Sequence, residues 1–157
     1  MSGVTDIIVI SIILFSVGVA LLVTVYVGHT VIADLKVQSS FNSSSQAVSV
    51  LNNSNTAINY TDYDYLGGFI GFFIMLIVTG YFVVGYPILS VIYYIVLILF
   101  GFISVILQNV WIYIISQPAF SSTSTTIPIT NYIMMHLAYF MVAFGLIAMV
   151  VTYAKAQ

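Results

Sequence analysis

The sequence predicts an all-α integral membrane protein built as a bundle of four transmembrane helices. Three observations lead to this fold class. First, 62% of the 157 residues are hydrophobic and only 4% are charged, whereas a soluble domain has about 25% charged residues. Second, the apolar residues form continuous runs of about 20 residues or more, which is the length needed to cross a hydrocarbon core about 30 Å thick. Third, these runs do not alternate with the period of two that marks the strands of a membrane barrel.

Four segments have this length, and with their connections they form one membrane domain over residues 1–157. Two stretches rich in Ser, Thr and Asn are predicted as polar loops, at about residues 38–65 and 116–131. Gly85-Tyr86-Pro87 is expected to form a tight turn between the second and third helices, because proline suits the first turn of a helix. The predicted helices cover about residues 7–33, 66–86, 88–115 and 132–153.

The two polar loops are expected on the same side of the membrane, since an even number of helices separates them. The positive-inside rule predicts orientation from basic residues, and the chain has only two, Lys36 and Lys155, so the rule indicates little here. Three Asn-x-Ser/Thr sequons, candidate glycosylation sites at Asn42, Asn52 and Asn59, favour an exterior position for the first loop. The sequence therefore predicts that both termini lie inside.

Charged and aromatic residues gather near the start of the second predicted helix. Asp62 and Asp64 precede it, where acidic groups favour the positive end of the helix dipole. An aromatic belt at the outer interface is expected from Trp111 together with Tyr60, Tyr63 and Tyr65.

Several functional classes are disfavoured by composition. The chain has no cysteine, which excludes disulfides and thiolate metal sites. Its two basic residues are both lysine, too few for a nucleic-acid surface. The N-terminus lacks the basic region of a cleavable signal, so we expect the first helix to be retained.

Small residues recur at helical spacing and predict close approach between helices. One interpretation is packing inside the bundle. The other is a flat face on the first helix that docks onto another subunit. The set comprises Ser16, Ala20, Thr24 and Gly28 in the first helix and Gly67 and Gly71 in the second.

The two histidines, His29 and His136, fall near the outer ends of antiparallel helices and are expected at similar depth. Such a pair could ligate a haem axially, or hold copper or zinc together with Asp34. A quinone held by hydrogen bonds is a further alternative. No local ligand motif such as HxxxH supports these sites. The structural alternative is that each imidazole bonds a neighbouring carbonyl or hydroxyl.

No catalytic residues are predicted, because no serine has a base and an acid arranged around it within the helices. The helices carry scattered hydroxyls, which usually bond backbone carbonyls, and no ionisable pathway of the kind a pump needs. By elimination, the sequence predicts a non-catalytic structural or accessory subunit of a larger membrane complex, of respiratory or oxidase type or similar.

Two alternatives to the accessory subunit stay open. One is an electron-transfer subunit that uses the histidine pair, and the other is a self-assembling envelope protein. The expected location is a cell membrane or a virion membrane. The partners would be the lipid bilayer and either other membrane subunits or copies of the chain. The composition resembles that of membrane proteins from archaea and their viruses, although no motif identifies a family.

Overall fold

The computed structural model describes residues 2–83 and 87–156, and within them the protein is all-helical without strands. Four of the described helices are long: α1 (Ser2–Val37), α3 (Ser45–Val83), α4 (Pro87–Ile115) and α7 (Leu137–Ala156). Shorter elements connect them. These are α2 (Ser39–Asn42), α5 (Pro118–Ser121), the 3-10 helix η1 (Thr123–Thr125) and α6 (Pro128–Met135).

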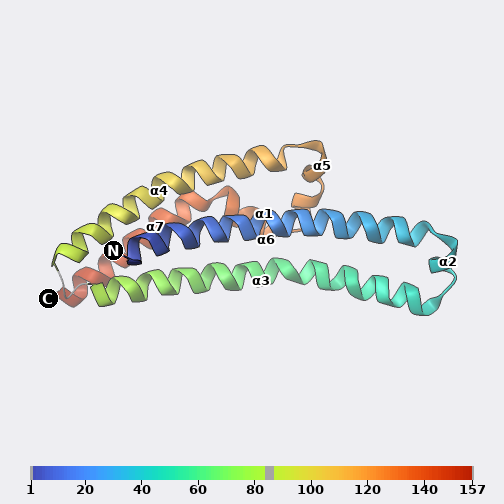
Figure 1. The fold of residues 1–157 in the computed structure, drawn as a ribbon, viewed down its shortest axis with the longest axis horizontal. Coiled ribbons are helices and arrows are strands. Elements are labelled where there is room, and N and C mark those ends of the chain that lie inside the picture. Colours follow the sequence, from blue (N-terminus) through green and yellow to red (C-terminus); the bar gives the residue numbers. More distant parts are fainter. Residues whose placement is uncertain (1, 84–86, 157) are drawn as a thin grey trace.

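Helices α1 and α3 form a long antiparallel hairpin with α2 at its tip (Figure 1). Both ends of the chain lie at the opposite end of the molecule from α2. Helix α7 packs against α3 and α4, while α5 and η1 return the chain from α4 toward α1. The hairpin extends beyond the level of α5, so its tip stands apart from the other helices (Figure 1).

Length and apolar character make several of these helices able to cross a membrane. Three stretches qualify in the described residues: Ile12–Val37, Ser45–Val78 and Tyr94–Ile115. A fourth is added if Pro128–Met135 and Leu137–Val151 form one span, bent by 71°. The fold is therefore that of a multi-pass helical membrane protein, with three to four candidate spans.

The region predicted as a loop over residues 38–65 is helical for most of its length, because α3 begins at Ser45. The reason is a seam of residues spaced alternately by three and four, which lies along one face of the whole helix. In the polar half this seam contains Leu51, Ile58 and Asp62, which are buried or half-buried. The Ser and Asn residues on the other faces are mostly exposed. Asp62 and Asp64 are consequently inside a helix rather than in front of one.

The fourth predicted helix, residues 132–153, is also different in the structure. It begins earlier, at Pro128, and breaks after Met135 before α7 starts at Leu137. Proline in the first turn of α6 explains the earlier start, since it has no N–H to leave unbonded there. The predicted turn at 85–87 falls largely on residues 84–86, which are outside the described residues.

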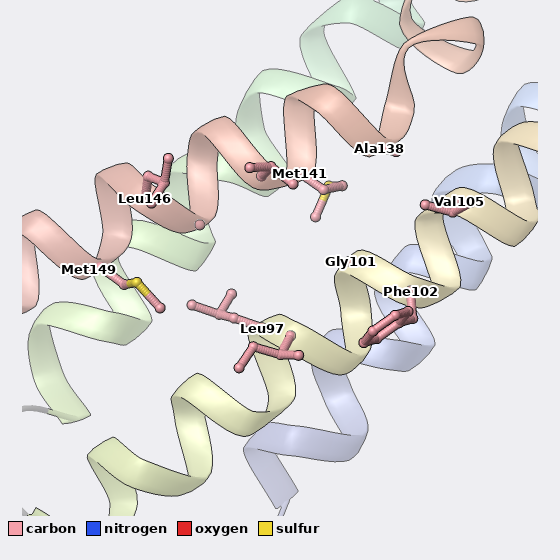
Figure 2. Close-up of a pocket in the computed structure, with 11 residues that line it drawn as sticks. Leu97, Gly101, Phe102, Val105, Ala138, Met141, Leu146 and Met149 are labelled. Carbon is pink, nitrogen blue, oxygen red and sulfur yellow. The ribbon is translucent and has the colours of Figure 1, made fainter.

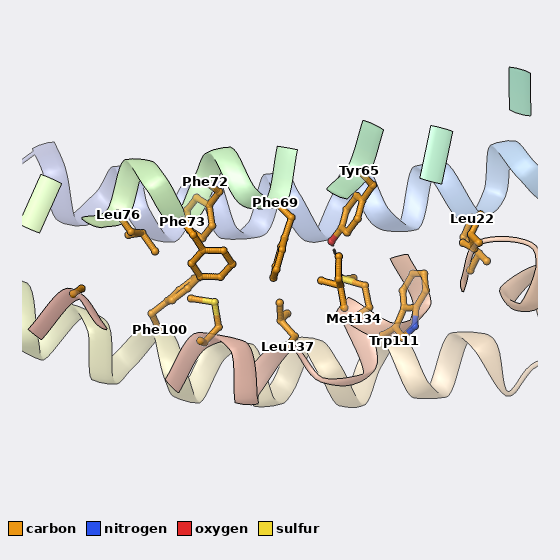
Figure 3. Close-up of a cluster of buried hydrophobic side chains, with 14 of the residues drawn as sticks. Leu22, Tyr65, Phe69, Phe72, Phe73, Leu76, Phe100, Trp111, Met134 and Leu137 are labelled. Atoms are coloured by element: carbon orange, nitrogen blue, oxygen red, sulfur yellow. Dashed lines mark hydrogen bonds between the residues drawn. The ribbon is translucent and has the colours of Figure 1, made fainter. Parts of the chain in front are cut away.

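One part of the core is a ladder of aromatic rings between α3, α4 and α7, and residues of α1 and α6 complete the core (Figure 3). Phe73 stacks on Phe144 with ring centroids 3.6 Å apart and meets Phe69 edge-on at 4.6 Å. Phe72 contacts Phe100 at 5.9 Å. The Phe73–Phe144 contact joins α3 to α7, and the Phe72–Phe100 contact joins α3 to α4 with the edge-to-face geometry that aromatic pairs prefer.

Candidate functional site

Polar side chains converge on α6 and on its break with α7, and the buried carboxylate among them is Asp62. This residue, on α3, is 2% exposed. Its carboxylate accepts hydrogen bonds from the backbone N–H of Ile129 (2.9 Å), the N–H of Thr130 (2.7 Å) and the Thr130 hydroxyl (2.6 Å). The two amides belong to the first turn of α6, where no intrahelical acceptor exists. Since Ile127 at the N-cap makes no side-chain bond, Asp62 supplies the cap from another helix.

The start of α7 is capped in the same way. The backbone N–H of Ala138 donates to Oε1 of Gln108 on α4, at 3.1 Å. At the break itself, Nδ1 of His136 lies 2.9 Å from the carbonyl oxygen of Tyr132. Each half of the broken helix therefore has its first turn held by a side chain from a different long helix.

Two further side-chain contacts fix α6 against its neighbours. Trp111, fully buried on α4, donates from Nε1 to Oδ1 of Asn131 at 3.0 Å. The Tyr65 hydroxyl donates to the sulfur of Met134 at 3.0 Å (Figure 3). Together with the Asp62 cap, these contacts tie α6 to α3 and α4 along its length.

The contacts of this polar cluster hold α6 and α7 against the long helices. Its carboxylate is occupied by three donors, and its imidazole faces a carbonyl oxygen. Its physical effect is to hold a sharp bend while satisfying the backbone groups that the bend releases, as hydrocarbon surroundings require.

The two histidines do not lie at the equal depth expected from the sequence. A Cβ added to Gly28, beside His29, would lie 2.6 Å from Ile58, whereas one added to Gly18 would lie 3.2 Å from Met134. Gly18 and Gly28 are about 15 Å apart along α1, so His29 and the α6–α7 break occupy different levels. The cause is the early start and break of the fourth helix.

His29 and Asp34 also do not form a ligand cluster with other residues. In the described part of the chain, no three His, Cys, Asp or Glu side chains come together as a metal site. Nε2 of His29 is shielded from solvent and has no hydrogen-bond partner there. Asp34 is exposed. The haem, copper and quinone hypotheses gain no second ligand from this geometry.

The small-residue set divides between two roles. Gly28 lies against the Ile58 side chain and so permits close approach of α1 and α3. The remaining members are exposed on the outer faces of their helices, and Cβ atoms added at the two α3 glycines would meet nothing within 4 Å. These exposed members are Ser16, Ala20, Thr24, Gly67 and Gly71. Packing inside the bundle therefore accounts for Gly28 alone.

The sequon asparagines Asn42, Asn52 and Asn59 are all exposed on the hairpin, the first in α2 and the others in α3. Their glycosylation stays a prediction.

An apolar groove of about 370 Å³ runs between α4 and α7 (Figure 2). Gly101, Ala138 and Gly145 provide its room, and Leu97, Phe102 and Met149 stand along its sides. All of the side chains that line it are apolar. Such a surface suits hydrocarbon and has no group that could orient a polar substrate.

The capping role of Asp62 was not visible in the sequence, because its partners follow 67 and 68 positions later. One local signal existed. Pro128 marks a helix start, and the residue before it, Ile127, cannot cap that helix with its side chain.

Comparison of the chain with known protein families, with curated proteins and with solved structures finds no match.

Proposed function

We propose that this protein is a non-catalytic accessory subunit of a larger membrane assembly, in which it crosses the bilayer four times with both termini inside. One observation carries the proposal: α1 is apolar on all sides, yet the rest of the chain covers only one of its faces. Leu22 and Val25 are buried in the core, but Val27 and Val31 on another face are 49% and 48% exposed. A helix that is hydrophobic all round is normally buried, either within protein or in the hydrocarbon of a membrane.

Lipid does not fully cover these valines, because of their position along the molecule. Gly18 of α1 abuts Tyr65 of α3, and α3 changes there from a polar to an apolar sequence. Residues of α1 beyond Gly18 therefore lie beside the polar half of α3, whose exposed residues include Thr56 and Asn59. Hydrocarbon at this level would cover the apolar face of α1, but it would also surround the polar side chains of α3. Burying polar groups in hydrocarbon costs free energy.

We name the exposed face of α1 at this level the α1 ridge, consisting of Val23, Val27 and Val31. Its residues are spaced by four, so they form one stripe along the helix. α1 is 36 residues long, or about 54 Å, against a hydrocarbon core of about 30 Å. An apolar helix of another subunit would cover the part of the ridge that the bilayer leaves in water.

Cysteine cross-linking in native membranes tests this proposal, because the chain has no cysteine of its own. Val27→Cys places a single thiol on the α1 ridge, and Thr56→Cys places one on the polar side of the hairpin as a matched exposed control. We expect a short bifunctional or photoactivated thiol reagent to give a defined larger species with Val27→Cys alone. A cross-linked species equally abundant with both variants, or absent with both, would overturn the proposal.

The self-assembling alternative uses the same surface, and the α1 ridge is the observation that favours it. In a symmetric pair, the same patch of both copies is in contact. A Val27→Cys product of twice the 17.2 kDa chain mass would identify a second copy. A product of any other mass would identify a different subunit, to be named by peptide sequencing.

A further inference from the structure

A second groove, of about 310 Å³, lies between α1 and α3. It differs from the groove of Figure 2 because its walls include a carboxylate. The α1 wall is apolar throughout. Its lining includes Ile13, Val17 and Leu21 of α1 and Asp64, Tyr65 and Gly68 of α3.

The polarity of this groove changes along its length. Asp64 stands at the end nearer the hairpin tip, and Gly68 lies one helical turn further toward the apolar half of α3. The antiparallel α1 wall runs over about 12 Å from Leu21, near the polar end, to Ile13. The groove therefore has a charged mouth and an apolar floor, and the apolar half of α3 begins just below that mouth.

The carboxylate at the mouth has no counter-charge within the described structure. No hydrogen bond or ion pair involves Asp64 there, and the side chain is exposed. The nearby Thr61 hydroxyl already donates to the carbonyl oxygen of Ile58 at 2.6 Å. Lys36 lies near the hairpin tip, at the far end of α1. The mouth thus presents one unpaired negative charge.

The floor of the groove is open. A Cβ added at Gly68 would meet no atom within 4 Å. A linear chain can consequently lie against the Gly68 backbone without displacing a side chain.

We propose that this groove binds a membrane lipid with an amine headgroup, whose ammonium pairs with Asp64 and whose chain lies along the α1 wall. Charge complementarity selects the headgroup, because an anionic headgroup would be repelled by the carboxylate. The apolar wall selects a lipid rather than a free amine, which would leave that wall uncovered. The groove uses residues 13–21 of α1, whereas the α1 ridge begins at Val23, so the inference goes beyond the proposed function.

Lipid retention measured by native mass spectrometry tests the site. The whole chain is reconstituted in vesicles of equal parts phosphatidylethanolamine and phosphatidylglycerol with identical acyl chains, then released in a mild detergent. We expect the wild type to retain phosphatidylethanolamine preferentially. Asp64→Asn should lower that preference about fivefold, the scale of an exposed ion pair. Asp64→Glu should keep it, and Gly68→Leu should abolish retention by filling the floor.

Matched controls separate the groove from general effects. Asp34→Asn removes another exposed carboxylate and Gly71→Leu fills another open glycine, and neither residue lines the groove. Both should retain lipid like the wild type, and unchanged circular dichroism should show that every variant is folded. The proposal fails if the wild type shows no headgroup preference, if Asp34→Asn lowers the preference as much as Asp64→Asn, or if Gly68→Leu still retains the lipid.

Discussion

Asp62 illustrates how a single residue can determine the shape of this fold. A carboxylate buried away from water is costly unless donors surround it, and Asp62 receives three of them from α6. Its position at the start of that helix adds a favourable interaction with the helix dipole. The charge and the helix end thus stabilise each other, and both depend on the chain returning to α3 after the α5–η1 connection.

Removing this cap should destabilise the protein. Asp62→Ala leaves two backbone amides and a hydroxyl without their acceptor, and we expect a loss of about 2 kcal/mol or more in the free energy of unfolding. Unfolding in detergent can be followed by the fluorescence of Trp111, the single tryptophan, which is fully buried. Asp64→Ala is the matched control and should change stability by no more than about 0.5 kcal/mol. Equal effects of the two substitutions would contradict the capping role.

At the scale of elements, α3 joins two environments in one continuous helix. Its apolar half carries the aromatic ladder, and its polar half packs on α1 through Leu51 and Ile58. Leu51 is 7% exposed although Ser49, Asn52 and Asn53 lie close to it in sequence. The seam, rather than the overall polarity of the stretch, decides that it is helical.

Hydrogen exchange of the folded protein provides a direct check on the polar half of α3. We expect slow exchange at the backbone amides of about residues 49–61, because helical hydrogen bonds protect them. The amides of residues 38–44 around α2 should exchange faster, since that tip lacks a regular helix of more than one turn. Uniformly fast exchange from residue 38 to residue 61 would instead support the loop predicted from composition.

The whole molecule is elongated, and different parts of the chain lie at its two ends. The hairpin tip lies at one end, and both termini lie at the other (Figure 1). With four crossings, this arrangement fits the proposed orientation with both termini inside and the sequon-bearing hairpin outside.

Single cysteines can test this orientation in intact cells or sealed vesicles. Ser40→Cys at the tip and Ala154→Cys near the C-terminus are both at exposed positions. A membrane-impermeant maleimide applied from outside should label only Ser40→Cys, and permeabilisation should make Ala154→Cys reactive. Labelling of Ala154→Cys alone before permeabilisation would reverse the assigned orientation. Labelling of both variants would place the two positions on the same side, with an even number of crossings between them.

The sequence was sufficient to predict an all-helical chain with several helices long and apolar enough to cross a membrane. Residues 88–115 were predicted as a helix and form α4, because a long uninterrupted apolar run has few other stable conformations in a membrane. The same property made 7–33 and 66–86 readable as helices, although α1 and α3 both extend well beyond those limits. The composition of a segment indicates whether it lies in lipid or in water. For a segment in lipid, this is enough to predict a helix.

The candidate site depended on tertiary contacts that the sequence does not display. His136 was expected inside a continuous helix, yet it stands at a break held by Gln108, and α6 begins early under the cap of Asp62. These partners come from other helices and stand about 30 or more positions away, beyond the range of helical periodicity. The apolar runs by themselves determined that this chain is a helical membrane protein, because partition into lipid depends on local composition. Only the tertiary structure decided where the helices bend and which polar groups meet, because those choices depend on partners distant in sequence.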